Sequence, residues 1–329
     1  PQCLDCRRVF VRRSRKKHYL CESGGNLPPE PKPNPTMKKS HIVGIGEALW
    51  DVLPEGKKIG GAPANFAFHM SQFGYDAIAV SAVGDDDNGR ELRDTLQSRG
   101  MKFLLPELDR PTGTVNVTLD AAGIPQYVIT ENVAWDHIPF TDQAAEIARH
   151  TACICFGSLA QRSPASRESI DRFIGLMPAD SLRIFDINLR QRYYDKEIIE
   201  SSLRKCDILK INDEETLTVA ALFGFAPDPE SVCRRLKEDY SLRAVILTCG
   251  AAGSRVYYGD EVSILSTPKV EVADTVGAGD SFTAGFCAAL LAGCSIARAH
   301  AVAVETSAYV CTQKGAMPLF PERITDMIK

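Results

Sequence analysis

Short apolar runs and longer amphipathic segments alternate along most of the chain. The short runs stand between turn residues and contain few polar positions, which is typical of strands buried on both faces of a sheet. The longer segments repeat their apolar residues with a helical period, which indicates helices. The predicted strands are 77–83, 152–156, 182–187, 207–211 and 243–248, with a further strand leading into a loop at 41–53. The predicted helices are 60–74, 88–99, 164–177, 195–205, 214–223, 229–238, 279–292 and 295–313.

The order of these segments predicts an α/β fold. Strands that are repeatedly followed by helices favour a mostly parallel central sheet with helices on both faces. Residues 113–130 break this order, because "TVNVTLD" and "QYVIT" alternate apolar and polar residues on either side of "AAGIP" and predict a hairpin. We place the hairpin in a small second sheet that covers one edge. Ligands of open α/β sheets bind beyond the carboxyl ends of the strands, where Asp51, 186–190 and 212–215 fall.

Residues 1–36 differ in composition from the rest of the chain. They hold eight Lys/Arg against three Asp/Glu and end in a Pro-rich tract that cannot be helical. We expect a disordered extension, or residues that precede a natural start at Met37, and an organised region over 37–329. Two alternatives are a targeting peptide and a zinc site. The candidate zinc ligands are Cys3, Cys6, His18 and Cys21.

Charge and cysteine content narrow the class of protein further. The net charge of −4 conceals +5 on residues 1–36, which leaves −9 on residues 37–329. An acidic body is poorly suited to neutralise phosphates, so we expect no nucleic-acid partner. No apolar run approaches the ~20 residues that cross a bilayer, so we expect no membrane partner. The cysteines of the body lie mostly in apolar contexts, which favours buried free thiols and a cytoplasmic protein.

The segment "DTVGAGDSFTAGFCAALLAG" (274–293) contains the strongest candidate chemistry. Two glycines and an alanine stand among the five residues between its two aspartates, at the start of a predicted helix. Because the first N–H groups of a helix have no partner and the dipole there is positive, this position attracts anions. Asp280 either caps the helix or shares its N-terminus with the phosphate of a ligand. No Walker pattern occurs, and "GIGEAL" lacks the third glycine of a dinucleotide-binding motif.

Together with "GGAPANFAFHMSQFG" (60–74), this segment resembles the two signatures of the PfkB, or ribokinase-like, family of carbohydrate kinases. The resemblance covers 41–329, and "GEALWDVLPEG", "AWDHI" and "CTQKGAMP" are most similar to the fructokinase branch. It implies a ribokinase-like three-layer sandwich with a small β-sheet lid, formed by segments 48–60 and 103–135. It also implies ATP-dependent phosphorylation of a primary hydroxyl of a small sugar, with fructose as the expected substrate.

The transfer of a phosphoryl group requires in-line positioning, neutralised phosphate charge and a base for the attacking hydroxyl. Asp280 is the candidate base, and the backbone N–H groups of Gly277, Ala278 and Gly279 are the candidate anion hole. Side chains in such a loop must be small for a phosphate to approach the backbone. A helix cap and a turn would explain one aspartate and one glycine, but not the whole segment.

The resemblance assigns further residues to the sugar and the nucleotide. Sugar contacts are expected from Asp51, Gly60, Gly61 and Asn65. Glu215 would order Mg²⁺ through water, since magnesium usually keeps several waters and uses few carboxylates. The nucleotide would be bound by Asn212, Glu215, Thr248, Gly250 and Gly253. Taken alone, "NDEE" (212–215) is also a common start of a helix, and "TCGAAGS" (248–254) could be a simple turn.

Three expectations are left open by the sequence. Arg190 could bind a phosphate or an acidic sugar, or it could pair with Asp186. The resemblance also suggests a monovalent cation, K⁺, near Asp274 and the carbonyl of Val276, and a homodimer through the lid sheet. The alternatives to a fructokinase are a kinase for 2-keto-3-deoxy acid sugars, a ribokinase-type kinase and, more remotely, a non-catalytic regulator on the same fold.

Overall fold

The computed structural model describes residues 40–53, 56–119 and 125–329, so the predictions for residues 1–36 lie outside the described residues. The strands are β1 (His41–Ile45), β2 (Leu49–Leu53), β3 (Gly56–Gly60), β4 (Asp76–Val80), β5 (Val83–Gly84), β6 (Lys102–Leu104), β7 (Glu107–Leu108), β8 (Gly113–Leu119), β9 (Pro125–Ile129), β10 (Thr151–Phe156), β11 (Leu182–Asp186), β12 (Ile208–Asn212), β13 (Ala244–Thr248), β14 (Ser254–Tyr258) and β15 (Glu261–Leu265). The α-helices are α1 (Ala62–Gln72), α2 (Asp87–Ser98), α3 (Asp142–Arg149), α4 (Pro164–Leu176), α5 (Lys196–Leu203), α6 (Asp213–Phe223), α7 (Pro229–Asp239), α8 (Ala278–Leu291), α9 (Ile296–Cys311) and α10 (Glu322–Thr325). Short 3₁₀ helices are η2 (Ala134–His137), η3 (Leu159–Arg162), η4 (Gly250–Ala252) and η5 (Asp326–Ile328).

The main sheet has nine strands in the order β15-β14-β13-β12-β11-β10-β1-β4-β6. The strands from β13 to β6 pair in parallel, and β14 and β15 add an antiparallel edge. This arrangement confirms the predicted mostly parallel central sheet. The antiparallel edge was not predicted, although Gly259–Asp260 between two β-rich runs is a hairpin signal.

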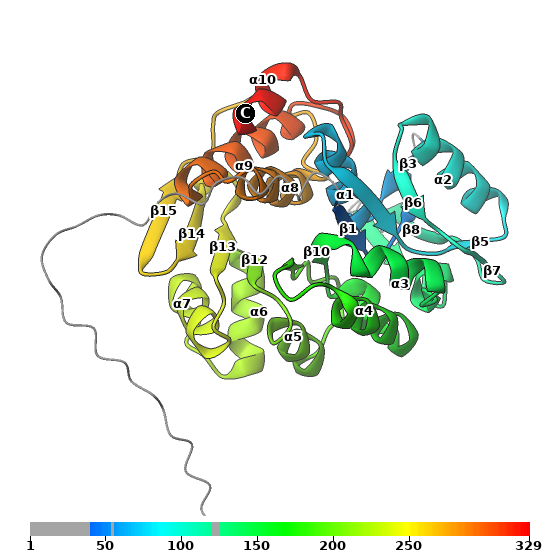
Figure 1. Cartoon of the computed structure of the whole chain (residues 1–329), viewed down its shortest axis with the longest axis horizontal. Helices are drawn as coiled ribbons and strands as arrows, with labels where there is room; N and C mark the ends of the chain where they lie inside the picture. The colour runs from blue at the N-terminus through cyan, green and yellow to red at the C-terminus, as the bar shows by residue number, and fades with distance from the viewer. Residues whose placement is uncertain (1–39, 54–55, 120–124) are drawn as a thin grey trace, which may run out of the picture. The chain divides into compact units, whose positions relative to one another are not determined.

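Helices cover both faces of the main sheet, as the apolar strands require. In β1 the side chain of Ile42 packs into one hydrophobic cluster and that of Val43 into the other, and Ile208 and Leu209 divide in the same way in β12. One cluster is completed by helices α1, α2, α8 and α9, and the opposite cluster by α3 to α7. Figure 1 shows these two helical layers on either side of the sheet. The three-layer architecture is therefore confirmed.

A separate four-stranded sheet has the order β3-β2-β8-β9. The hairpin predicted over 113–130 is confirmed, since β8 and β9 pair antiparallel. The prediction for 41–53 is only half right. Gly46 (φ 148°) separates β1 in the main sheet from β2 in the small sheet, where a loop was expected. Segments 48–60 and 103–135 supply these strands, and their function as a lid stays a prediction.

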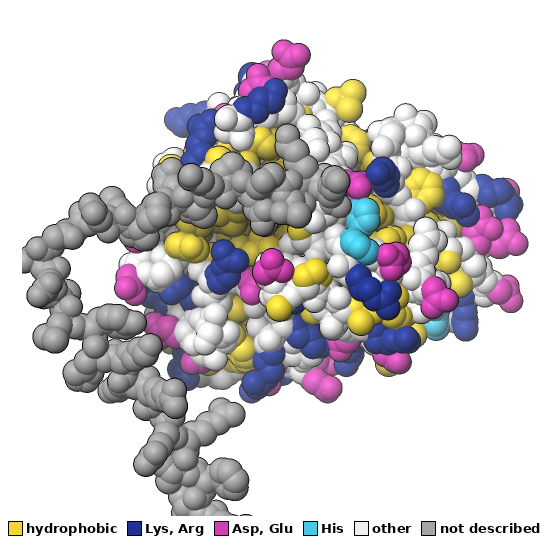
Figure 2. All heavy atoms as spheres, viewed as in Figure 1, with side chains coloured by type: hydrophobic (Ala, Val, Ile, Leu, Met, Phe, Trp, Pro, Cys, Tyr) yellow, Lys and Arg dark blue, Asp and Glu magenta, His cyan; other side chains and the backbone are white. Residues whose placement is uncertain are grey.

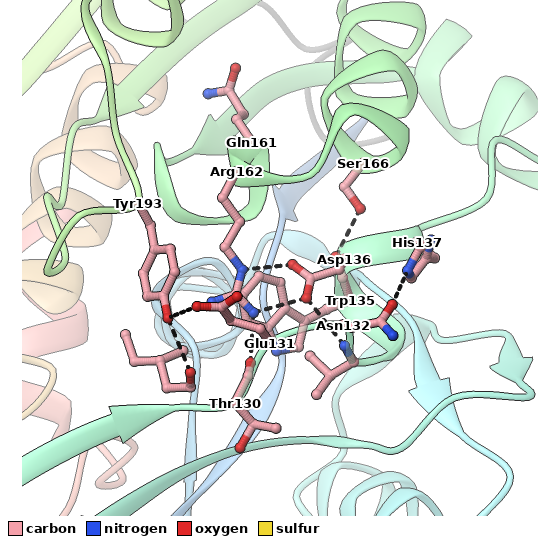
Figure 3. A network of polar contacts seen from close by, with 12 residues as sticks. Thr130, Glu131, Asn132, Trp135, Asp136, His137, Gln161, Arg162, Ser166 and Tyr193 are labelled. Carbon is pink, nitrogen blue, oxygen red and sulfur yellow. Dashed lines mark hydrogen bonds and ion pairs between the residues drawn. The ribbon is translucent and has the colours of Figure 1, made fainter.

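The small sheet is joined to the main sheet by Arg162, at the end of η3 (Figure 3). Its guanidinium lies between two aromatic rings, 4.1 Å from the centre of Trp135 and 4.5 Å from that of Tyr193. It donates two hydrogen bonds of 2.8 Å to the carboxylate of Asp136, and a third, of 2.6 Å, to the carbonyl of Thr130 just beyond β9. The bidentate pair with Asp136 fixes the orientation of the guanidinium. The bond to Thr130 then links the residue after β9 to η3, which follows strand β10 of the main sheet.

The described residues bear on the expectations about membrane spans, cysteines and charge. Among residues 40–53, 56–119 and 125–329, no helix is long and apolar enough to span a bilayer. The described cysteines are free thiols, and five of the eight are buried, as their apolar contexts predicted. Basic and acidic side chains intermingle on the face drawn in Figure 2. The expected lack of a nucleic-acid partner stays a prediction.

Candidate active site

The two sequence signatures meet at one point of the structure. Asn65, on α1, donates a hydrogen bond of 2.7 Å from Nδ2 to Oδ2 of Asp280, although 215 positions separate them. The first turns of α1 and α8 therefore lie side by side, and the two helices pack against each other on one face of the sheet. Asp280 does not cap its helix. The N-cap is Gly277, which offers no side chain, so Asp280 in the first turn is free to do chemistry.

The environment of Asp280 suits a base. Burial raises the pKa of its carboxyl to about 6, and the nearby charge of Asp186 acts in the same direction. The hydrogen bond from Asn65 and the charges of Lys210 and Arg190 oppose the increase. The resulting carboxylate is ionised at neutral pH but more basic than an exposed aspartate, as general-base catalysis requires.

Each of the two glycines in the candidate anion hole is required by a different feature of the structure. Gly277 adopts φ 78°, a conformation that side chains rarely allow, and a Cβ there would lie 2.7 Å from the carbonyl oxygen of Ala316. A Cβ on Gly279 would lie 2.8 Å from Nζ of Lys210. The surroundings therefore leave no space for a side chain at either glycine at the start of α8.

The predicted sugar contacts gather at the boundary of the small sheet and α1. Asp51 is on β2, and Gly60 ends the neighbouring antiparallel strand β3. A Cβ on Gly60 would lie 2.4 Å from Oδ2 of Asp51, so the glycine leaves space for that carboxylate. Gly61 adopts φ 111° as the N-cap of α1, four residues before the predicted Asn65. Burial raises the pKa of Asp51 to about 6, against the charges of Arg190 and Lys58.

Replacing Gly60 with alanine should weaken sugar binding more than it destabilises the fold. The new methyl group would displace the carboxylate of Asp51 and the terminal methyl of Leu49, both of which are flexible ends of side chains. A misplaced hydrogen-bond acceptor costs about 1–3 kcal/mol, so we expect KM for the sugar to increase about tenfold or more. The matched control is Gly175→Ala on α4, where nothing lies within 4 Å of the new Cβ. Steady-state kinetics on both variants test this, and an unchanged KM in Gly60→Ala would show that Asp51 does not bind the sugar.

The "NDEE" segment forms the start of α6 as a reciprocal cap. Oδ1 of Asn212 accepts from the N–H of Glu215, and Oε2 of Glu215 accepts from the N–H of Asn212, each at 2.8 Å. Oε1 of Glu215 accepts from the N–H of Leu189 at 2.9 Å. Burial raises the pKa of Glu215, and Lys210 opposes that effect. A carboxylate held in this way keeps lone pairs for water molecules, which fits the predicted magnesium site through water.

The remaining predicted nucleotide residues lie on the turn from β13 to β14. Thr248 ends β13, and Gly250 starts η4 with φ 51°. Gly253 has φ 108°, and a Cβ there would lie 2.4 Å from the carbonyl oxygen of Leu265. The turn alone explains both glycines. Their role in nucleotide binding stays a prediction.

Asp274 is held by backbone hydrogen bonds, whereas Arg190 does not form the ion pair with Asp186 that the sequence left open. Asp274 accepts hydrogen bonds from the N–H groups of Val276 and Gly315, each at 3.1 Å, and lies 3.7 Å from the ammonium of Lys58. Asp186 pairs with Lys210 instead of Arg190, at 3.0 Å. The charge of Arg190 lowers the pKa values of Asp51 and Asp280 against the effect of burial, and its place in the site stays a prediction.

Sequence reasoning missed three residues at this site, namely Glu47, Lys210 and Thr283. Glu47 follows β1 and is buried; among the described residues, its Oε2 has no hydrogen-bond partner. Burial raises the pKa of this carboxyl to about 7, and the charge of Asp280 contributes to the increase. A charged residue inside an apolar strand, as in "DILKIN" (207–212), is the signal that could have revealed Lys210.

Fold and site together define an ATP-dependent carbohydrate kinase. A model of the pfkB family carbohydrate kinases matches residues 53–323, so the chain belongs to this family.

Similar proteins and solved structures are also sugar kinases or phosphofructokinases. The chain is 28% identical to an ATP-dependent 6-phosphofructokinase of Thermoanaerobacterium thermosaccharolyticum over 87% of this chain and 92% of that protein. It is 29% identical to a fructokinase of Klebsiella pneumoniae over 84% of this chain and 95% of that protein. Among solved structures, an uncharacterized sugar kinase of Pyrococcus horikoshii in complex with ATP is similar with a TM-score of 0.74 and 25% identity. That comparison covers 88% of this chain and 100% of the other.

Proposed function

We propose that this kinase transfers the γ-phosphoryl group of ATP to a primary hydroxyl of fructose, with Asp280 as general base. The contact between Asn65 and Asp280 carries the proposal, because it joins the predicted sugar-binding helix to the predicted phosphate-binding helix at 2.7 Å. Asp51 is a half-buried acceptor for sugar hydroxyls at the same site. The similarity to a fructokinase supports the choice of fructose.

Each requirement of phosphoryl transfer is met by a different group of residues. Asp280 accepts the proton of the attacking hydroxyl, while the first N–H groups of α8, at 277–279, stabilise the charge on the transferred group. Asp51, Gly60, Gly61 and Asn65 orient the sugar so that the hydroxyl lies in line with the phosphorus. Arg190 neutralises phosphate charge. The nucleotide is bound by Asn212, Glu215 and the turn from Thr248 to Gly253.

Metal ions would complete the site. Glu215 fits Mg²⁺ bound through water, and the ion would shield the charge between the phosphates of ATP. The fit for K⁺ at Asp274 and the carbonyl of Val276 is poorer, because the ammonium of Lys58 already lies 3.7 Å from Oδ2 of Asp274. A monovalent cation there has to compete with Lys58.

The homodimer is proposed through the small sheet. Its outer strand β9 pairs only with β8 among the described strands, which leaves an unpaired backbone edge. Val128 on β9 exposes 52% of its surface, which is unusual for a large apolar side chain in a strand. Exposed edges of this kind pair readily with a second chain.

A panel of acceptors tests the proposed substrate. The panel contains fructose, ribose, a 2-keto-3-deoxy acid sugar and fructose 6-phosphate. The last is included because one relative is named a 6-phosphofructokinase. We expect kcat/KM for fructose to exceed each of the others at least tenfold, about 1.4 kcal/mol of discrimination. The measurement is ADP release in a coupled assay. A tenfold preference for an anionic acceptor would instead indicate that Arg190 binds substrate charge, and the fructose proposal would fall.

A further inference from the structure

Lys210 is a buried cation directly beneath the candidate anion hole. It lies on β12, where alternate residues face opposite sides of the sheet, and it shares the face of Ile208, toward α8. Its exposed fraction is 7%, in a position that an apolar residue would fill in an ordinary core strand. Lysine is almost never buried to this degree unless it is paired.

The pairing of Lys210 connects three elements. Nζ donates to Oδ1 of Asp186 at 3.0 Å, across neighbouring positions of the parallel strands β11 and β12. The other oxygen of Asp186, Oδ2, accepts from Oγ1 of Thr283 on α8, also at 3.0 Å. Oγ1 of Thr283 is equally close to the carbonyl oxygen of Gly279, at 3.0 Å. The ion pair is therefore tied to the first turn of α8.

The position of the ammonium is electrostatically unusual. A Cβ on Gly279 would lie 2.8 Å from Nζ, so the charge packs against the backbone that begins α8. The start of a helix is itself positive. Two positive fields converge there, and a structural ion pair alone would gain nothing from this arrangement. An incoming phosphoryl group would gain from both.

We propose that Lys210, held by Asp186 and Thr283, is a positioning residue that supplies the positive charge beneath Gly279 for the phosphoryl group and for the carboxylate of Asp280. The inference rests on the proposed function, because it assumes that phosphate reaches the N-terminus of α8. Lys210 acts through space and through the backbone of α8, and Asp186 determines where its charge lies.

The charges around Asp280 also support an effect of Lys210 on its carboxylate. Asp280 is surrounded by Lys210 and Arg190 as cations, by Asp186 and Glu47 as carboxyls and by the thiol of Cys155. Burial alone would lower the pKa of Lys210, but the charges of Asp186, Glu215 and Asp280 outweigh it and raise the pKa. Lys210 is therefore charged at neutral pH. It favours the ionised form of Asp280, whereas Asp186 opposes it.

Opposite effects of the two partners provide the test. In Lys210→Met, which keeps the length of the side chain, we expect the pKa of Asp280 to increase by about one unit, since a neighbouring charge shifts a pKa by about 1–3 units. In Asp186→Asn we expect a decrease, and in the double variant a value between the two. If the ion pair acted on Asp280 only by packing the first turn of α8, loss of either partner would move the pKa in the same direction, or not at all.

The pKa of Asp280 is measured by NMR on chains labelled with ¹³C at the aspartate carboxyls, with Asp280→Asn assigning the signal. This measurement needs neither sugar nor turnover. If Lys210→Met does not fold, Asp186→Asn and the double variant, which leaves no unpaired charge, still decide the question. A pKa of Asp280 that is unchanged, or shifted upward, in Asp186→Asn would overturn the inference.

The pH profile of kcat/KM, recorded on the same variants, separates this inference from the proposed function. We expect its acidic limb to follow the pKa seen by NMR, and kcat of Lys210→Met to fall at least tenfold at a pH where Asp280 is ionised. If the NMR values shift as expected but the kinetic limb does not follow, Lys210 influences Asp280 and Asp280 is not the base. An unchanged kcat would overturn the role toward the phosphoryl group.

Discussion

Replacing Asp280 with asparagine should reduce kcat about 10²–10⁴-fold, the usual contribution of a positioned general base. Asparagine retains the size of the side chain and can still accept the hydrogen bond from Asn65, but it cannot take a proton. Sugar and ATP contacts remain, so KM should change little. In the unmodified chain, activity should fall as the pH drops through about 6, because burial raises the pKa of Asp280 to about 6 and only the ionised form is a base.

The control for this variant is Asp228→Asn at another helix start. Asp228 caps α7 by accepting from the N–H of Ser231, and asparagine caps a helix equally well. We expect Asp228→Asn to retain full activity. Melting temperatures of both variants show whether a loss of rate has a structural origin. A well-folded Asp280→Asn with normal kcat would remove Asp280 as the base, and with it the mechanism proposed for this site.

The sequence predicted the central sheet because its signals there are local. Parallel strands buried on both faces appear as short apolar runs. A polar residue that directly follows such a run lies at the carboxyl end of the strand. The order of residues along the chain was therefore enough to place Asn212 and Asp186 at one edge of the sheet. The assignment of Asn65 and Asp280 to one site followed only from the family resemblance, and their direct contact was not predicted, since no local pattern relates positions that are 215 residues apart.

Other features depend on contacts that a linear pattern does not display. The run 41–53 is continuous in sequence, but Gly46 sends its second half into a different sheet. Helix α3 was missed because its eight residues contain few large apolar side chains. Lys210 was missed for the opposite reason. Its strand was predicted as core although it contains a lysine, and only the partners contributed by β11 and α8 show how that lysine is held at the site.

Replacing Arg162 with methionine should lower the free energy of unfolding by about 3–5 kcal/mol, the cost of breaking a buried ion pair on one side. The side chains of Arg162 and Asp136 are 8% and 5% exposed, so the carboxylate left behind would be both desolvated and unpaired. The change also removes the guanidinium that stacks on the rings of Trp135 and Tyr193. Chemical denaturation of both proteins measures the difference.

Two comparisons show whether the buried charge is the cause. Arg172→Met on α4 removes an arginine that also lies over an aromatic ring, 4.3 Å from the centre of Phe140, but is exposed. Its effect should stay within about 0.5 kcal/mol, as for most surface changes. Removing both charges, in Arg162→Met with Asp136→Leu, should recover part of the lost stability, because no buried carboxylate then lacks a partner. If the double variant is less stable than Arg162→Met by the full cost of a second core change, the loss comes from packing around Trp135, and the ion pair does not hold the small sheet in place.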